Sequence, residues 1–253
     1  MRLFLLFWVV VLAPFPAFSQ TIKSAVYSIN QLSVANQTGY GEQTLLEGAT
    51  RDFSHLIVQA ITIQANQPAQ PTQQFDEEAV LIIKTGELTL TVGGKRKILG
   101  PGNVVLIMPG DDFEVVNKAD RTLTYFQMRY TSNEMPDLDL YRLVGDSFWV
   151  DWQEAASTAD QPRRNQQTVT CSSVMSNRMA IQVTTVDPAS GVSAPHTHRA
   201  AEIMLILDHP AQAQIEGVST EAQVGDLIFV ESEVSHRIQP GVRENCTYVS
   251  IQF

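Results

Sequence analysis

The sequence predicts an all-β protein that consists of two tandem copies of one small domain. Three observations support this prediction. Short runs rich in Val, Ile, Leu, Thr and Tyr alternate with turn-forming Gly and Pro, and no long stretch shows helical periodicity. The chain also aligns with itself without gaps at an offset of 123 residues. Many short strands at this spacing are typical of a β-sandwich or a β-barrel.

The composition indicates a folded protein and excludes nucleic acid as a partner. The 253 residues are 44% hydrophobic and 17% charged, which is enough apolar material for a buried core. Lys and Arg number 17 against 27 Asp and Glu, a formal net charge of -10. A surface that follows phosphates needs clustered cations, so this class of partner is not expected.

Residues 1–19 are predicted to be a secretory signal peptide. Arg2 precedes an apolar run from Leu3 to Leu12, prolines follow, and we expect cleavage near Ser19. A retained membrane anchor is the weaker alternative, because the apolar run is too short to span a bilayer. No other stretch reaches transmembrane length, so we expect an exported protein, periplasmic or secreted, with no membrane partner.

The internal repeat defines the expected domains. Residues 54–63 align with residues 177–186, and the two copies end together at Tyr130 and Phe253. One ancestral domain was therefore duplicated, with repeat units of about 24–130 and 147–253. The expected division is a signal peptide (1–19), an N-terminal barrel (20–130), a connecting segment (131–165) and a C-terminal barrel (166–253).

Each unit is predicted to consist of strands and tight turns. Strands in the first unit are expected at residues 56–63, 80–84, 87–92, 104–108 and 123–129. The pairs Gly93-Gly94 and Pro109-Gly110 mark turns, because Gly accepts a positive φ and Pro presets a turn angle. The connecting segment is polar and has room for one short helix.

The second unit carries a cluster of residue types that bind metal ions. Residues two apart on a strand point to the same face, so His196 and His198 project together, and Glu202 has the same parity. His236 follows an intervening hairpin and would add a ligand from a neighbouring strand. Imidazoles and a carboxylate on a rigid sheet make a good divalent-metal site, with one or two positions left for water or substrate.

These residues resemble the two conserved motifs of the cupin superfamily. The pattern His-x-His-x3-Glu at residues 196–202 is followed by Gly-x10-His at residues 225–236. The resemblance implies small jelly-roll barrels, also called double-stranded β-helices, with the metal inside the barrel. The implied ligands are His196, His198, Glu202 and His236. Because the resemblance covers both repeats, the chain resembles a bicupin.

The motifs depart from the cupin pattern at several turn positions. His209 replaces the Gly that usually ends the first motif. The usual Pro, Gly and Asn of the second motif are Glu231, Glu233 and Pro240. These changes affect turns and leave the ligand positions intact.

The first unit lacks the ligands. At the offset of 123, the four ligand positions correspond to Gln73, Phe75, Ala79 and Phe113. We therefore expect an apolar interior in this barrel, which would serve as a scaffold or a dry ligand pocket. A substitute site built from Gln74, Glu77 and Glu78 is the weaker alternative, because adjacent strand residues face opposite ways.

Several other residues of the second unit have two interpretations. Glu231 and Glu233 could support the metal or act as a general base, or they could form a solvated acidic turn. Arg199 and Arg243 could bind a carboxylate near the mouth of the barrel, or they could be surface charges. Four apolar side chains share the parity of the ligands and could line a pocket or form core: Met204, Ile206, Phe229 and Ile238.

The remaining histidines and the cysteines are not assigned to the site. His209 is expected in a hairpin turn, and His55 is expected to be structural or exposed. Cys171 and Cys246 could form a disulfide in an oxidising compartment or remain two buried thiols.

The expected function is that of a metal-dependent enzyme. Three imidazoles and one carboxylate suit Mn, Fe, Ni, Cu or Zn, and the absence of Cys ligands favours an open site over a closed structural zinc site. The resemblance implies a small-molecule substrate and either a dioxygenase or a Mn-type hydrolase, isomerase or decarboxylase. A bicupin with metal only in its C-terminal barrel also resembles the arrangement of the ureidoglycine aminohydrolases. The alternative is a non-catalytic exported protein that binds a small ligand. A homo-oligomer is possible because sheet edges often pair.

Overall fold

The computed structural model describes residues 20–29, 39–136, 139, 145–152, 166–171, 173–176, 179–190, 194–241 and 244–253. The predicted signal peptide lies outside these residues. The elements of the described residues are eighteen strands and one 3-10 turn at Pro188–Ser190, with single helical residues at Asp139 and Trp152, so the all-β prediction is confirmed. No helix among the described residues is long and apolar enough to cross a membrane.

The strands form two equivalent pairs of sheets. In the first barrel, the larger sheet has the order β10 (Phe148–Val150), β7 (Val104–Ile107), β4 (Glu78–Thr85), β9 (Leu123–Ser132), β3 (Phe53–Ile63) and β2 (Tyr40–Gly48). Its smaller sheet has the order β6 (Lys95–Leu99), β5 (Leu88–Val92) and β8 (Phe113–Val116).

The second barrel repeats this arrangement. Its larger sheet has the order β1 (Ala25–Tyr27), β16 (Leu227–Val230), β13 (Glu202–Ile206), β18 (Cys246–Gln252), β12 (Met179–Val186) and β11 (Gln166–Cys171). Its smaller sheet has the order β15 (Val218–Ala222), β14 (Ala211–Ile215) and β17 (His236–Pro240).

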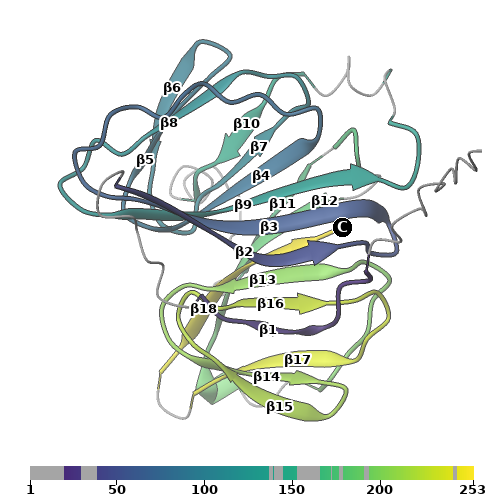
Figure 1. The fold of residues 1–253 in the computed structure, drawn as a ribbon. Coiled ribbons are helices and arrows are strands. Elements are labelled where there is room, and N and C mark those ends of the chain that lie inside the picture. The colour runs from purple at the N-terminus through teal and green to yellow at the C-terminus, as the bar shows by residue number, and fades with distance from the viewer. Residues whose placement is uncertain are drawn as a thin grey trace, which may run out of the picture.

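The four sheets stack as layers around three hydrophobic cores. The two six-stranded sheets face each other in the centre, and a three-stranded sheet covers the far side of each (Figure 1). On β4, Val80 and Ile82 pack in the central core, while Leu81 and Ile83 pack inside the first barrel. Both faces of this strand are buried, which explains its unbroken apolar sequence.

The central core joins the two barrels through aromatic stacking. The Phe53 ring stacks on Tyr130 at a centroid distance of 4.5 Å and on Phe253 at 4.7 Å. All three side chains are at most 4% exposed. Phe229, which the sequence places on the ligand face, also packs in this central core. Its neighbours Ile228 and Val230 point into the second barrel instead, so of the two interpretations of Phe229 the core one holds and it does not line the ligand face.

The repeat at an offset of 123 extends to individual contacts. Strands β5, β6 and β7 correspond residue for residue to β14, β15 and β16. A hydroxyl pair of Thr62 and Thr124 at 3.0 Å in the first barrel has its counterpart in Thr185 and Thr247, also at 3.0 Å. The two units therefore share one backbone plan, although equivalent strands differ in length, as β4 with 8 residues and β13 with 5 show.

The two units exchange their first strands. β1 pairs with β16 of the second barrel, with Ala25 opposite Phe229. β10 pairs with β7 of the first barrel, with Phe148 opposite Leu106, which is the same register after the offset of 123. Each barrel thus contains a strand from the other repeat unit. The domain boundaries expected from the sequence, at residues 130 and 166, instead assign β1 to the N-terminal barrel and β10 to the connecting segment.

The two cysteines lie far apart along the sheet. Cys171 is opposite Met179 on β12, whereas the other end of that strand places Val186 opposite Cys246. Seven residue steps of a strand correspond to about 23 Å, well beyond the roughly 7 Å that a disulfide requires. Cys246 is a buried free thiol, and the register of β11 and β12 excludes a disulfide between it and Cys171.

Candidate metal centre

Three segments of the second barrel bring the predicted ligands together. Glu202 begins β13 and His236 begins β17. His196 is joined to His236 by an isolated antiparallel bridge, in which each backbone N–H donates to the other residue's carbonyl oxygen at 3.0 Å. His198 lies in the following loop and not on a continuous strand, but it still points toward the other two imidazoles.

The three imidazoles converge on one point, and the carboxylate of Glu202 lies against two of them. One ring nitrogen from each of His196, His198 and His236 lies within 4.8 Å of the others. Oε2 of Glu202 lies 3.2 Å from Nε2 of His198 and 3.2 Å from Nε2 of His236. His236 is 2% and Glu202 5% exposed, whereas His196 is exposed. The centre is therefore buried on one side and open on the other.

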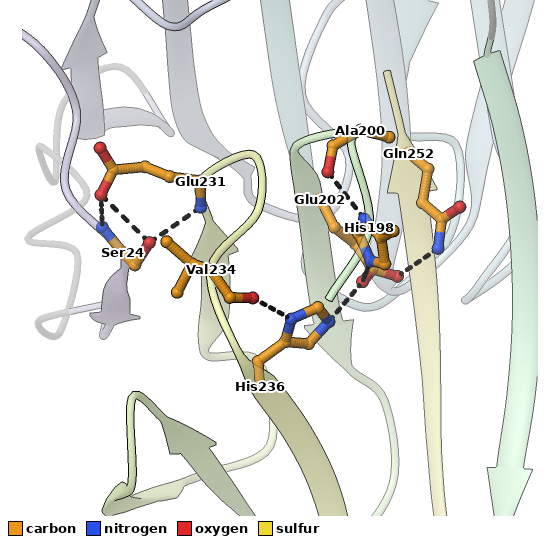
Figure 2. Close-up of polar contacts among 8 residues, drawn as sticks. All are labelled: Ser24, His198, Ala200, Glu202, Glu231, Val234, His236 and Gln252. Carbon is orange, nitrogen blue, oxygen red and sulfur yellow. Dashed lines mark hydrogen bonds and ion pairs between the residues drawn. The ribbon is translucent and has the colours of Figure 1, made fainter. Parts of the chain in front are cut away.

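Backbone carbonyls fix the orientation of the rings. Nδ1 of His198 donates to the carbonyl oxygen of Ala200 at 2.7 Å, and Nδ1 of His236 donates to that of Val234 at 2.9 Å (Figure 2). Because a carbonyl can only accept, Nδ1 carries a proton. Nε2, which points to Glu202, donates to that carboxylate while the ring is protonated and presents a lone pair, as a metal ligand does, once the ring is neutral. Histidines that bind metal ions are held in this way.

Glu202 is held in its ionised form. Burial by itself would raise the pKa of Glu202, but hydrogen bonds from His198, His236 and Gln252 outweigh burial and lower the pKa to about 2. Gln252 donates from Nε2 to the second oxygen, Oε1, at 3.3 Å. The site therefore contains a buried negative charge at neutral pH. Neutral imidazoles cannot balance it, so a cation fits this donor set.

The neighbouring charges shift the histidine pKa values in opposite directions. The hydrogen bond with Glu202 raises the pKa of His198. Burial, followed by repulsion from His236 and His198, lowers the pKa of His196. His196 is therefore the more readily deprotonated of these two, as a ligand at the open side of the centre would need to be.

The first barrel has the same backbone geometry without the donors. Gln73 and Phe113 form the equivalent bridge, with hydrogen bonds of 2.8 and 2.9 Å. Phe75 and Phe113 meet edge to face at 5.5 Å, and the guanidinium of Arg129 lies 4.9 Å from the centre of the Phe75 ring. Ala79 is fully buried beside them. The expected apolar interior is confirmed.

The substitute site in the first barrel is not formed. Glu77 interacts with His55 at 3.6 Å and with Arg129 at 3.3 Å. Glu78 accepts hydrogen bonds from Ser173 and from the backbone of Met175. Within the described ranges, the three histidines are the one group of His, Cys, Asp or Glu side chains close enough to hold a metal ion.

Smaller side chains line the second barrel, a difference that the sequence analysis missed. Three buried leucines of the first barrel are alanines in the second, so each isobutyl group becomes a methyl group. Ala213 lies opposite Ile238, two residues beyond His236. Aligning the two repeats position by position could have found these pairs, which are Leu88 and Ala211, Leu90 and Ala213, and Leu99 and Ala222.

The structure also places the other residues considered from the sequence. Glu231 binds Ser24 and Lys23 and lies outside the histidine cluster. Arg199 lines a cavity of about 370 Å³ between the barrels, and Arg243 lies outside the described residues. Met204, Ile206 and Ile238 pack inside the second barrel.

The two remaining histidines lie at the surface. His209 follows β13 in the turn before β14, where its ring lies 3.6 Å from Asp208 and 3.7 Å from Glu244. His55 lies 3.3 Å from Glu47. Both positions agree with the structural interpretations of these residues.

Comparisons with known proteins identify the fold. Residues 61–128 match the family model of the cupin domain. This match lies in the first barrel, which lacks the proposed metal ligands. A search of curated proteins found no match.

Several solved structures are similar in fold to this chain over most of its length. A putative glyoxylate-induced protein from Pseudomonas aeruginosa is 18% identical, with coverage of 90% of this chain and 84% of that one, at a TM-score of 0.64. A cupin 2 conserved barrel domain protein from Leptotrichia buccalis is 10% identical (86% and 90% covered, TM-score 0.53). A salicylate 1,2-dioxygenase from Pseudaminobacter salicylatoxidans is also 10% identical (78% and 70% covered, TM-score 0.54).

Proposed function

We propose that this protein, which has the cupin fold, binds one divalent metal ion in its second barrel and uses it to act on a small organic molecule. The proposed ligands are His196, His198, Glu202 and His236. The observation that carries the proposal is the buried, ionised carboxylate of Glu202 beneath imidazoles whose Nε2 atoms converge on it. A divalent ion would satisfy this set of donors.

The donor set suits Mn, Fe, Ni, Cu or Zn. When bound, such an ion would supply Lewis-acid chemistry or, for a redox-active metal, dioxygen chemistry. The chain's own contribution is to hold the imidazoles in one tautomer and Glu202 in its charged form. The exposed side of His196 leaves one face of the centre open to a small molecule.

A small-molecule substrate is supported by the side chains beside the centre. Ala211, Ala213 and Ala222 replace leucines of the apolar first barrel, so the side chains at three buried positions are smaller in the second. Room beside the ligands is what a site for a small molecule requires. The salicylate 1,2-dioxygenase shows that a chain of this fold supports dioxygenase chemistry, and we propose a dioxygenase or a Mn-type hydrolase, isomerase or decarboxylase.

A non-catalytic ligand-binding role is the second candidate, and one observation favours it. Two ionisable side chains pack in the apolar interior of the second barrel, Cys246 and Tyr248. Burial raises the pKa of each to about 12, so neither accepts a proton at neutral pH. A proton acceptor for catalysis would therefore have to come from the metal ion or from Glu233, in the turn that leads to His236. Binding alone needs no proton acceptor.

The proposed site of action is outside the cytoplasm. The pattern of residues 1–19 supports export to the periplasm or secretion. Cell fractionation of the full-length protein tests this part of the proposal, and a protein that keeps residues 1–19 in the cytoplasm would contradict it.

Elemental analysis of protein purified without chelators or added metals tests the function. We expect one metal ion per chain in the wild type and none in His196→Ala. Gln73→Ala, the matched change in the first barrel, should leave the metal content unchanged. Two ions per chain would contradict the assignment of the first barrel, and none would contradict the metal site itself.

Turnover distinguishes the two candidates. With a panel of small carboxylates, amides and phenols, the enzyme proposal predicts metal-dependent conversion that is lost in His196→Ala. A ligand that binds tightly and is recovered unchanged would support the binding role instead.

A further inference from the structure

The first strand of the chain is attached to the turn that leads into the metal centre. The backbone N–H and the hydroxyl of Ser24 donate to Oε2 of Glu231 at 3.1 and 3.2 Å (Figure 2). The backbone N–H of Glu231 donates to the Ser24 hydroxyl oxygen at 2.8 Å. Nζ of Lys23 lies 3.6 Å from the other carboxylate oxygen. These contacts hold β1, which comes from the first repeat unit, onto the end of β16.

The same turn makes direct contact with two of the proposed ligands. It runs from Glu231 to His236, and the N–H of Val234 donates to the carbonyl of Glu231 at 3.2 Å. The carbonyl of Val234 is the acceptor that orients the ring of His236. The N–H of Glu233 donates to the backbone carbonyl of His198 at 2.9 Å. A displacement of this turn would therefore disturb both histidines.

The turn also contains a residue in an unfavourable backbone conformation. Glu233 has a φ of +64°. At the equivalent position of the first barrel, Gly110 has a φ of +82° and makes the equivalent hydrogen bond, to the carbonyl of Phe75 at 2.8 Å. An L-residue with a side chain pays roughly 1–2 kcal/mol for this region, and such residues persist where the surrounding contacts enforce them. The turn above the histidines therefore depends on external contacts more than its counterpart does.

We propose that Ser24 and Glu231 are positioning residues for the metal centre. The exchanged strand β1 holds the turn, and the turn holds His236 and the backbone of His198 in the geometry that binds the metal ion. This inference rests on the proposed function, because it requires that the histidines bind a metal ion. It adds that the first repeat unit contributes directly to the site of the second.

The first barrel contains the equivalent of the contact between Ser24 and the turn, at a turn that leads to no metal-binding histidine. The N–H and the hydroxyl of Ser147 donate to Oδ2 of Asp111 at 3.3 and 2.6 Å. The Ser147 hydroxyl oxygen accepts from the backbone N–H of Met108 at 2.9 Å. Ser147 and Met108 are the equivalents of Ser24 and Glu231 at the offset of 123, and this turn leads to Phe113. Ser147→Ala thus removes the same kind of contact away from the metal centre.

The test is a metal titration of full-length metal-free protein with Co²⁺, followed by its visible absorption. We expect Ser24→Ala and Glu231→Ala to weaken Co²⁺ affinity about tenfold or more, because loss of contacts that orient metal ligands typically costs 10- to 100-fold. Ser24→Thr keeps the hydroxyl and should restore the affinity. Ser147→Ala should remain within about twofold of the wild type, while its melting temperature falls about as much as that of Ser24→Ala.

The outcomes separate this inference from the metal site itself. If the wild type binds Co²⁺ and Ser24→Ala and Glu231→Ala bind it equally well, the positioning role is wrong and the metal site stands. If Ser147→Ala weakens binding as much as Ser24→Ala, the effect is general destabilisation and the inference is wrong. A wild type that binds no Co²⁺ contradicts the proposed function, and the inference fails with it. Should Ser24→Ala not fold, Glu231→Ala and Ser24→Thr decide the question.

Discussion

One buried carboxylate distinguishes the interior of the second barrel from that of the first. Glu202 is 5% exposed, yet hydrogen bonds from three side chains lower its pKa to about 2. Its counterpart in the first barrel is Ala79, which is surrounded by apolar groups. A single position thus separates a charged interior from an apolar one, and the neighbouring residues differ accordingly.

Metal retention should depend on pH through the histidines. A metal ion needs neutral imidazoles, and the hydrogen bond with Glu202 raises the pKa of His198, so protons compete more strongly there. We expect the metal content to fall as the pH decreases through the histidine range, from about 7 to 5. Glu202 stays ionised over this range and does not contribute. Elemental analysis after dialysis at each pH measures the loss. The same profile is expected for His209→Ala, and a flat wild-type profile would contradict the ligand assignment.

The ionised carboxylate of Glu78 is expected to lower the free energy of unfolding, and this effect should disappear at low pH, where the carboxyl is protonated. Burial raises its pKa, and Oε1 has no hydrogen-bond partner among the described residues. A carboxyl whose pKa is raised in the folded state destabilises the protein above that pKa, and the penalty is relieved as the pH falls. Glu78→Gln keeps an acceptor for Ser173 and Met175 and should be about 1–2 kcal/mol more stable at pH 8.

Thermal unfolding across pH tests this expectation. The advantage of Glu78→Gln over the wild type should shrink between pH 8 and pH 5, because the wild-type carboxyl becomes protonated. Glu77→Gln, at the partly exposed neighbouring position, is the control. A Glu78→Gln protein less stable than the wild type at pH 8 would show that the charge is satisfied.

The sequence predicted the ligand positions but not their support. Residue types and spacing that resemble the cupin motifs were sufficient to single out His196, His198, Glu202 and His236, although the strand-parity argument does not apply to His198, which lies in a loop. Gln252, which binds Glu202, lies 50 positions away and becomes a neighbour only through pairing of β13 with β18. Such contacts depend on sheet order, which spacing does not contain.

At the level of elements, the sequence predicted the strands that have at least one apolar face, because such strands leave a recognisable run of apolar residues. The runs predicted at residues 56–63, 80–84 and 104–108 correspond to β3 (53–63), β4 (78–85) and β7 (104–107), so the predicted strands are right and only their ends differ. The short strands β1 and β10 were not predicted. Each has three residues, too few for a periodic pattern, and each obtains its stability from a partner sheet of the other unit.

At the level of the whole molecule, the central core makes two barrels into one unit. Phe53 of the first barrel stacks on Phe253 of the second, and the surrounding core contains residues of both. With the strand exchange, neither barrel can unfold without exposing the apolar face of the other. We therefore expect a single cooperative thermal transition.

Differential scanning calorimetry measures this cooperativity. Phe53→Ala should destabilise the protein by about 3–5 kcal/mol and shift the single transition as a whole. Ile98→Ala, at a side chain that is 60% exposed, should leave the transition unchanged. Two separate transitions in the wild type, or a shift of only one of them in Phe53→Ala, would show that the barrels are independent.

The strand exchange also bears on how the two barrels came to differ. A lone repeat unit would leave its first strand without a sheet, and two identical units satisfy each other reciprocally, as in a twofold homodimer. In such a homodimer every substitution appears in both sites at once. Covalent fusion removes that constraint while keeping the exchanged strands in place. One copy could then lose the ligand histidines and fill with leucine and phenylalanine, while the other kept its donors and has alanine in place of three of those leucines.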